Sequence, residues 1–451
     1  MGPSAFGSGT QGIPGLGGGL LGGFASGLTV SVNGMVTPPM AVGDDGVLPG
    51  PGWTQIRLPV PGYSIDEFAL FQHSGLPLSA GERPLLVVCH RFGVTHFDAL
   101  VFTEFFEEAL ARGWYLLAPL SRNPDGPADI NYGSAASQEF TAVGMEFVLD
   151  NYPIDKTRIY GVGFSMGGAQ VMSYAARHMA PKDGMFAALV NHTGSIDQAD
   201  TWRLEPAAKT VMEGIFDGVP SDRPFAYRTA SVLELDEVTG QFVVGGKHQA
   251  INLSSTPTQL WWATSDPLQY LVDQTLQHEA YLQSIGATNF ESFPIVSSTH
   301  EWNTLDYTAI CDWFDQQQLV IPNEATILAD RDRRWVRIDV SGIPAKTIAE
   351  FTYSFDLANN VVEFRETESL DQLKTNLKLW NNGSTVSLPL TVKLDAQDVG
   401  DTVVLGGITS FPLAVTRDGV PQATGWSYDS LLQELTITEL ETGPHAWEFL
   451  P

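Results

Sequence analysis

The stretch Gly163-Phe164-Ser165-Met166-Gly167 is the one Gly-x-Ser-x-Gly pattern in a chain of 451 residues. Glycines two places before and after a serine permit a strand-to-helix turn that is too sharp for larger side chains and leaves the hydroxyl exposed. RIYGVGF (158–164) precedes the serine as a predicted strand, and GGAQVMSYAARHM (167–179) follows it as a predicted helix. This context favours Ser165 as a nucleophile for acyl transfer over a serine in an ordinary tight turn.

A serine nucleophile needs a base that accepts its proton and a carboxylate that orients the base. In a strand-turn-helix arrangement of this kind, the order along the chain is serine, acid, histidine. His278 lies in a helical stretch and His445 in a β-rich tail, whereas His300 lies in a loop after the last predicted core strand. We therefore expect His300 to be the base.

The acid is expected at the end of a strand, where side chains point to the ligand side of an open α/β sheet. Asp266 directly follows the predicted strand TQLWWAT (258–264). The competing acids are Asp273 and Glu301, and the alternative role for Asp266 is an Asp-Pro turn. Asp266 is the preferred acid.

Acyl transfer also needs amide donors for the oxyanion. The Met166 amide, directly before the predicted helix, is expected to be one donor. The second should come from His90-Arg91-Phe92-Gly93, the loop after the predicted strand PLLVVCH (84–90).

Two runs, NYPIDKTRIYGVGFSMGG and PLLVVCHRFG, resemble the elbow segment and the oxyanion loop of the α/β-hydrolase superfamily. The region from about 53 to 318 is most similar to its polyhydroxyalkanoate-depolymerase, feruloyl-esterase and prolyl-oligopeptidase-like group. The resemblance implies Ser165 as nucleophile, Asp266 as acid, His300 as base and Phe92 as the second amide donor.

Arg91 departs from this resemblance, because the superfamily usually has glycine at its position. The Arg91 amide is therefore the alternative oxyanion donor. Its side chain could bind a substrate carboxylate or an acid of the lid, or form a surface ion pair.

The pattern of apolar runs predicts an α/β fold with a doubly wound, mostly parallel sheet, followed by an all-β, sandwich-like domain. We expect a Gly- and Pro-rich leader at 1–52, a catalytic domain at 53–325 with a lid insertion at 195–257, and a β-sandwich accessory domain at 326–451. Core strands are expected at 84–90, 114–120, 158–164, 186–194, 258–264 and 290–296, with helices at 97–113, 138–152 and 267–286. In the tail, WVRIDVS, EFTYSFDL, TVSLPLTVKL and ELTITEL alternate as antiparallel strands.

Composition excludes several classes of partner. The net charge of −28 repels phosphates, so nucleic acid and anionic membranes are poor partners. Neither metal-ligand spacing nor a phosphate-binding loop occurs, so we expect no metal and no cofactor. Cys89 and Cys311 fall in apolar segments and are expected to be buried thiols.

The N-terminal stretch has no Lys or Arg before Arg57 and so has no clear signal peptide. Secretion after removal of an unseen signal is one option, and the oligomeric state is left open. No apolar run reaches the length of a membrane span.

Three aromatic residues, Phe92, Phe164 and Trp302, lie within two positions of proposed site groups and are expected to form substrate walls. We expect a carboxylic ester substrate, with polyesters and aromatic or acyl esters as candidates. The alternatives are a prolyl-oligopeptidase-like serine peptidase and a non-catalytic, hydrolase-like binding protein. The β-rich tail either binds a polymer or glycan or covers apolar surface of the catalytic domain.

Overall fold

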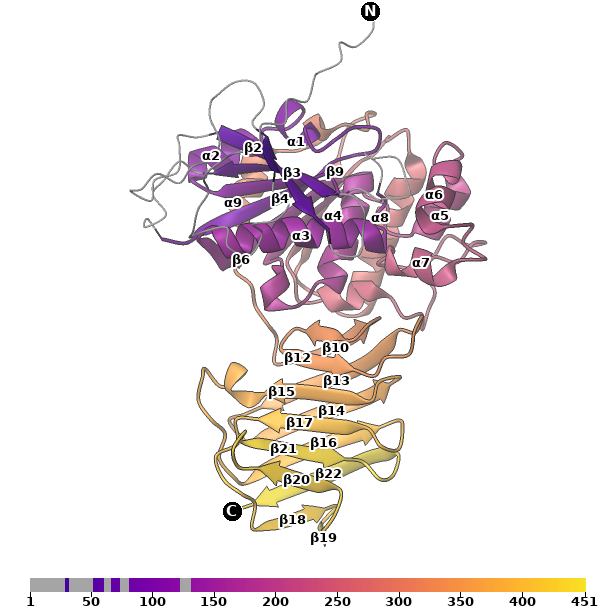
Figure 1. Ribbon diagram of the computed structural model, residues 1–451. Helices are drawn as coiled ribbons and strands as arrows, with labels where there is room; N and C mark the ends of the chain where they lie inside the picture. Colours follow the sequence, from indigo (N-terminus) through magenta and orange to yellow (C-terminus); the bar gives the residue numbers. More distant parts are fainter. Residues whose placement is uncertain (1–28, 32–51, 61–65, 74–80, 122–130) are drawn as a thin grey trace, which may run out of the picture.

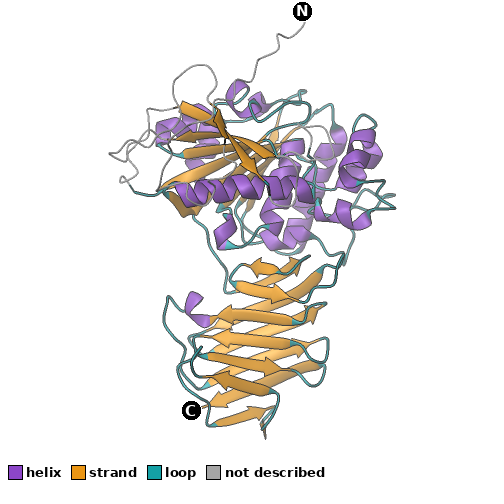
Figure 2. Ribbon diagram, in the orientation of Figure 1, coloured by secondary structure: helices purple, strands orange, loops and turns teal. Residues whose placement is uncertain are grey.

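The computed structural model describes residues 29–31, 52–60, 66–73, 81–121 and 131–451. Helices surround one large sheet in the upper part of Figure 1, and the lower part is nearly all strand (Figure 2). The predicted leader lies outside the described residues except for Thr29–Ser31 and Gly52. None of the helices in the described ranges is long and apolar enough to cross a membrane.

The large sheet has nine strands in the order β1-β2-β3-β5-β4-β6-β7-β8-β9. β4 to β9 are parallel, and β1, β2 and β3 are antiparallel at one edge. The strands are β1 (Thr29–Ser31), β2 (Gly52–Pro59), β3 (Asp66–His73), β4 (Arg83–Cys89), β5 (Tyr115–Pro119), β6 (Ile154–Phe164), β7 (Ala188–His192), β8 (Thr258–Ala263) and β9 (Phe290–Ile295). This mostly parallel sheet with helices on both faces is the α/β-hydrolase fold, as predicted.

Alternation along β4 explains why helices cover both faces. Leu85 and Val87 pack into one buried cluster, and Leu86 and Val88 pack into another on the opposite face. The first cluster is covered by α3 (Ala135–Asn151), α4 (Met166–Arg177) and α8 (Gln269–Ser284); the second by α1 (Asp98–Val101), α2 (Phe105–Arg112) and α9 (Tyr307–Phe314).

The single helix predicted at 97–113 is wrong, because α1 and α2 are separate. Between them the Thr103 hydroxyl donates to the Ala99 carbonyl at 2.5 Å and accepts from the Phe105 amide at 3.3 Å. A hydroxyl that bonds the backbone in this way competes with the helical pattern. Gly113, with φ 69°, ends α2 as predicted.

The long connection between β7 and β8, residues 195–257, forms a cap of short helices. They are α5 (Gln198–Leu204), α6 (Lys209–Phe216), α7 (Pro224–Thr229) and the 3-10 helix η3 (Gln249–Leu253). Figure 1 shows α5, α6 and α7 together on one side of the large sheet. The described residues of this part also form the 3-10 helices η2 (Pro181–Asp183) and η4 (Trp302–Thr304).

The chain after α9 forms two further sheets. One has the order β10-β13-β14-β16-β22-β18-β19 and the other β11-β12-β15-β17-β21-β20. The elements are β10 (Glu324–Ala329), β11 (Arg333–Trp335), β12 (Ile338–Ser341), β13 (Ala349–Asp356), β14 (Val361–Glu368), β15 (Gln372–Asn376), η5 (Leu377–Leu379), β16 (Leu390–Ala396), β17 (Thr402–Gly406), β18 (Ala414–Arg417), β19 (Val420–Pro421), β20 (Trp426–Asp429), β21 (Glu434–Thr438) and β22 (Gly443–Leu450).

Two predictions for this β part need correction. WVRIDVS is a hairpin of β11 and β12 and not one strand, because Val336 adopts φ 60° between them. The pairing is not wholly antiparallel either: β14 pairs with β16, and β15 with β17, in parallel. From β14 to β17 the chain alternates between the two sheets, so the strands that meet in one sheet run in the same direction.

The last residue of α4 connects the β part to the large sheet. Arg177 pairs with Asp330, the residue after β10, at 2.5 Å, and the two side chains are 4% and 3% exposed. Arg177 also donates to the side-chain oxygen of Gln138 on α3 at 2.6 Å. Met179, just after α4, belongs to the buried cluster of the β part. The helix that starts beside Ser165 is therefore anchored at its other end by the β part.

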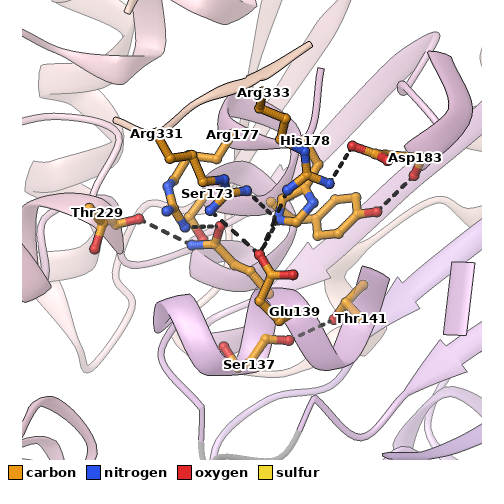
Figure 3. Close-up of polar contacts among 12 residues, drawn as sticks. Ser137, Glu139, Thr141, Ser173, Arg177, His178, Asp183, Thr229, Arg331 and Arg333 are labelled. Carbon is orange, nitrogen blue, oxygen red and sulfur yellow. Dashed lines mark hydrogen bonds and ion pairs between the residues drawn. The ribbon is translucent and has the colours of Figure 1, made fainter. Parts of the chain in front are cut away.

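Further ion pairs surround this junction (Figure 3). Arg331 and Arg333 approach the carboxylate of Glu139 on α3 at 3.5 and 3.7 Å, and Arg333 also pairs with Asp183. His178 lies among these cations and is fully buried. Burial and the neighbouring arginines hold the pKa of His178 well below its ordinary value. The His178 ring is therefore neutral, and the junction charges come from arginines and carboxylates.

Candidate active site

Ser165 lies between the end of β6 and the start of α4 in a strained backbone conformation. Its dihedral angles are φ 56° and ψ −120°, a region that L-residues rarely occupy. A side chain at Gly163 would overlap the Gly167 carbonyl, and one at Gly167 would overlap the Cys89 carbonyl. Only glycine fits at these two positions, because any side chain would overlap the backbone. The turn presents Ser165 to a cavity.

Asp266 and His300 are hydrogen-bonded to each other. His300 Nδ1 lies 2.8 Å from Asp266 Oδ2, and the Asp266 side chain is almost fully buried. The Leu268 amide donates to the second oxygen, Oδ1, at 2.8 Å. These contacts fix the ring so that Nδ1 faces the carboxylate and Nε2 is left as the reactive nitrogen.

His300 packs beside the elbow through Phe164, the residue before Ser165. The two rings have centroids 4.5 Å apart. Within the described part of the chain, His300 Nε2 is buried without a hydrogen-bond partner, and no hydrogen bond joins it to Ser165. Catalytic hydrogen bonds of this kind often shorten only when substrate is bound. The structure thus brings Asp266 and His300 into contact and places His300 next to the turn that holds Ser165.

The competing acids are occupied elsewhere. Asp273 accepts a hydrogen bond from Gln269 on the exposed side of α8, and Glu301 pairs with Arg91.

Two other histidines have partners away from Ser165. His445, in β22, is bonded to Asp418 within the β part. His248 of the cap, which the sequence interpretation did not consider, bonds the backbone of Glu234 and Val243.

Met166 and Phe92, the two residues expected to supply the oxyanion amides, both line the cavity with Ser165. Met166 is the first residue of α4, so its amide cannot find a partner within the helix. The Arg91 amide instead faces Asp98 Oδ2 at 3.4 Å, whereas Phe92 lines the cavity with Ser165. This geometry favours Phe92 over Arg91 as the second donor.

The Arg91 side chain ties two loops of the site together. It pairs with Glu301, next to His300, and its Nε lies 3.4 Å from Asp98 Oδ1. Trp302 Nε1 donates to Asp98 Oδ2 at 2.6 Å. Of the roles expected for the Arg91 side chain, the structure thus shows an ion pair within the protein. Through Asp98 and Glu301 it links the loop after β4 to the two residues that follow the histidine, Glu301 and Trp302.

A cavity of about 180 Å³ adjoins Ser165. Its lining comes from the oxyanion loop, the elbow, the segment before α3, the cap and the start of α8: Phe92, Tyr132, Ser165, Met166, Ser195, Thr201, Glu205, Ala207, Ala208, Leu268, Tyr270 and Leu271. Sequence reasoning missed the cap residues and both tyrosines, since no motif marks them.

Of the three aromatic residues predicted to form substrate walls, Phe92 alone lines this cavity; it is 40% exposed. Phe164 is fully buried on β6, where its ring stacks on His192 and makes a tilted contact with His300. Trp302 is 1% exposed and packs against Phe105 and Phe164. Their prediction as walls is therefore corrected: side chains alternate along a strand, so Phe164 faces the core beneath the elbow.

His278, discounted above as a base, lies in α8 with 1% exposure. Neither ring nitrogen has a hydrogen-bond partner among the described residues, and burial lowers its pKa from 6.5 to about 4. The folded protein therefore takes up this proton less readily than the unfolded chain does. Its contribution to stability is fully present above pH 6.5 and is lost as the pH falls toward 4.

We expect this histidine to remove about 2 kcal/mol from the free energy of unfolding between neutral pH and pH 5. In chemical denaturation at the two pH values, the loss for wild type should exceed the loss for His278→Leu by that amount. Equal losses in the two proteins would show that His278 does not titrate on unfolding.

No protein-family model matches the sequence, and a comparison with curated proteins found no match. Among solved structures, the chain is similar to a fluorophosphonate-binding serine hydrolase of Staphylococcus aureus, at 14% identity and a TM-score of 0.42, over 59% of this chain and 99% of that one. An S-formylglutathione hydrolase from Agrobacterium tumefaciens matches at 14% identity and a TM-score of 0.40, over 60% and 96%.

Pyrococcus horikoshii acylaminoacyl peptidase matches at 12% identity and a TM-score of 0.44, over 61% of this chain and 43% of that one. All these scores are low, so the fold assignment rests on the strand arrangement of this chain and the chemistry on its own site. Among the residues that the structure describes, no group of three His, Cys, Asp or Glu side chains could hold a metal ion.

Proposed function

We propose that this protein is a serine hydrolase that cleaves carboxylic esters with a small acyl or aryl group. The observation that carries the proposal is the strained Ser165 at a cavity, on a turn against which His300, paired with Asp266, is packed. Strain of this kind persists where the surrounding structure enforces it, and it concentrates at functional sites.

In the proposed mechanism, His300 Nε2 takes the proton of the Ser165 hydroxyl as Oγ attacks the ester carbonyl carbon. The amides of Met166 and Phe92 stabilise the oxyanion. The tetrahedral intermediate expels the alcohol, which takes the proton from His300, and the acyl group stays on Ser165. Water, deprotonated by His300, then attacks the acyl-enzyme and releases the carboxylic acid and free Ser165.

The cavity limits the size of the group that binds beside Ser165. An apolar protein cavity of about 150 Å³ holds one benzene ring, and this cavity measures about 180 Å³. A short acyl chain or one substituted aromatic ring fits such a space. If a polyester binds, only about one repeat unit can occupy the cavity at a time.

Labelling with a fluorophosphonate probe, followed by peptide mapping, tests the nucleophile. We expect the label on the peptide that contains Ser165. A panel of 4-nitrophenyl esters of graded acyl length tests the substrate class. We expect kcat/KM to be highest for short or aryl acyl groups and to fall once the chain outgrows the cavity.

Absence of labelling together with absence of ester hydrolysis would contradict the proposal. The non-catalytic alternative predicts that result. Cleavage of peptide amides without hydrolysis of any ester would favour the peptidase alternative.

A further inference from the structure

Among the residues that the structure describes, Glu205 is the one carboxylate in the lining of the cavity beside Ser165. It follows α5 directly, and its backbone amide bonds the Thr201 carbonyl at 2.9 Å, so the end of the helix holds it in place. Most of the remaining lining is apolar or aromatic. A carboxylate in this setting distinguishes the cavity from a simple pocket for hydrocarbon groups.

The carboxylate is held by hydrogen bonds but is not neutralised. The Ala207 amide donates to Oε1 at 3.1 Å, and the Tyr270 hydroxyl also bonds the Glu205 side chain. Nearby cations are engaged elsewhere: Arg203 pairs with Asp200, and the Lys209 ammonium lies 4.7 Å from the centre of the Trp202 ring. Across the described residues, Glu205 forms no salt bridge.

The negative charge acts on its neighbours in the cavity. Burial first, and the Glu205 charge after it, raise the pKa of Tyr132 well above its ordinary value. Burial is also the largest cause of the raised pKa of Tyr270, with Glu205 among the other contributors. Both tyrosines therefore remain neutral and add no second negative charge to the cavity.

An unpaired carboxylate is a cost to a site that must also stabilise an oxyanion, because like charges repel. The cost is offset if the substrate brings a positive charge of its own. A cation between Glu205 and the reacting carbonyl would pair with the carboxylate in the ground state. It would also lower the repulsion on the oxyanion in the transition state.

We propose that the substrate carries a cationic ammonium group, which Glu205 binds while Ser165 attacks the ester carbonyl. This inference rests on the proposed function and narrows its substrate class to basic esters. The cavity volume of about 180 Å³ restricts the ammonium and the carbonyl to one small group, such as an aminoalkyl chain or an aminomethyl-substituted ring.

Matched esters that differ only in charge test the inference. Ethyl 4-(aminomethyl)benzoate and ethyl 4-ethylbenzoate place CH₂NH₃⁺ or CH₂CH₃ at the same position of the acyl group. The acetates of 4-(aminomethyl)phenol and 4-ethylphenol do so on the alcohol side. We expect at least one cationic ester to exceed its neutral partner in kcat/KM by about tenfold or more in wild type.

In Glu205→Gln the cationic ester should lose about 10- to 100-fold in kcat/KM, while the neutral ester should show no loss, because removal of the carboxylate charge relieves the repulsion on its oxyanion. The control is Glu237→Gln, on an exposed part of the cap outside the cavity lining, which should behave as wild type. Benzylammonium should inhibit hydrolysis of the neutral ester competitively in wild type and much more weakly in Glu205→Gln.

Equal kcat/KM for the charged and neutral partners in wild type, or equal losses on both in Glu205→Gln, would overturn the inference and leave the esterase proposal intact. A preference for the hydroxymethyl analogue over the aminomethyl ester would also overturn it, because the site would then select a neutral donor. Loss of fluorophosphonate labelling and of hydrolysis of every ester marks the separate failure of the proposed function.

Discussion

Ser165→Ala is expected to lower kcat for a short ester by about 10⁴- to 10⁶-fold. The variant keeps both oxyanion amides and the Asp266–His300 pair but has no oxygen to form the acyl-enzyme. The free energy of unfolding should stay within about 1 kcal/mol of wild type, since alanine adds no atoms and meets the same backbone strain at φ 56°. Ester hydrolysis, corrected for the spontaneous rate, and chemical denaturation measure the two effects.

The matched control is Ser173→Ala, a serine of α4, the helix that follows Ser165; the Ser173 hydroxyl donates to the Ala169 carbonyl at 2.6 Å. It is expected to keep most of the activity. Residues that act as one unit are not additive, so Ser165→Ala combined with His300→Ala should be about as slow as Ser165→Ala alone. Near wild-type turnover in Ser165→Ala would remove the proposed mechanism.

Those parts of the site that depend on a local pattern could be predicted from the sequence. The Gly-x-Ser-x-Gly stretch lies where strand, turn and helix were expected, because the two glycines are fixed by contacts within a few residues and with the neighbouring strand. Asp266 was selected from its position after a strand, and the structure bonds it to His300. Parallel strands bring their carboxyl ends to one edge, so order along the chain carries spatial information.

The cavity walls could not be predicted in this way. Phe164 and Trp302 are close to the site in sequence, yet they pack into the core on the side away from the cavity lining. Glu205 and Tyr270 line the cavity, although the cap residue is about forty positions from Ser165 and neither follows a strand end. Their positions depend on how the cap packs against α8, and the periodicity of the sequence does not encode that packing.

The β part shows the same division between local and long-range information. Alternation located β12, β13, β16 and β21, because one face of each is largely buried, and it missed the other strands of this part. It could not show that the chain changes sheets between β14 and β17, which makes two pairs parallel. The hairpin at Val336 was missed because a β-branched residue with φ 60° gives no turn signal in the sequence.

Arg177→Met is expected to lower the free energy of unfolding by about 3–5 kcal/mol. Arg177 Nε and a terminal nitrogen both donate to Asp330 Oδ2, at 2.8 and 2.5 Å, and the carboxylate is 3% exposed. Removing the arginine leaves a buried charge with its main partner gone. Chemical denaturation measures the loss, and Arg334→Met is the control, since its pair with Asp339 has both side chains 44% exposed and contributes about 1 kcal/mol or less.

Replacing both partners distinguishes a buried ion pair from simple loss of packing. Arg177→Met combined with Asp330→Leu should recover much of the stability, because an apolar pair no longer carries the desolvation cost of an unpaired charge. If Arg177→Met were no more destabilising than Arg334→Met, the junction would not hold the β part against α4.

Arg177→Met also tests the role of the β part. This part either binds a polymer or covers apolar surface of the hydrolase domain. Because Arg177 ends the helix that Ser165 begins, weakening the junction should lower the fraction of protein that a fluorophosphonate can label after mild heating. Turnover per labelled site on a soluble ester should stay close to wild type, since no atom at Ser165 has changed. That combination favours the covering role, because a module that only binds polymer could be loosened without any effect on soluble substrate.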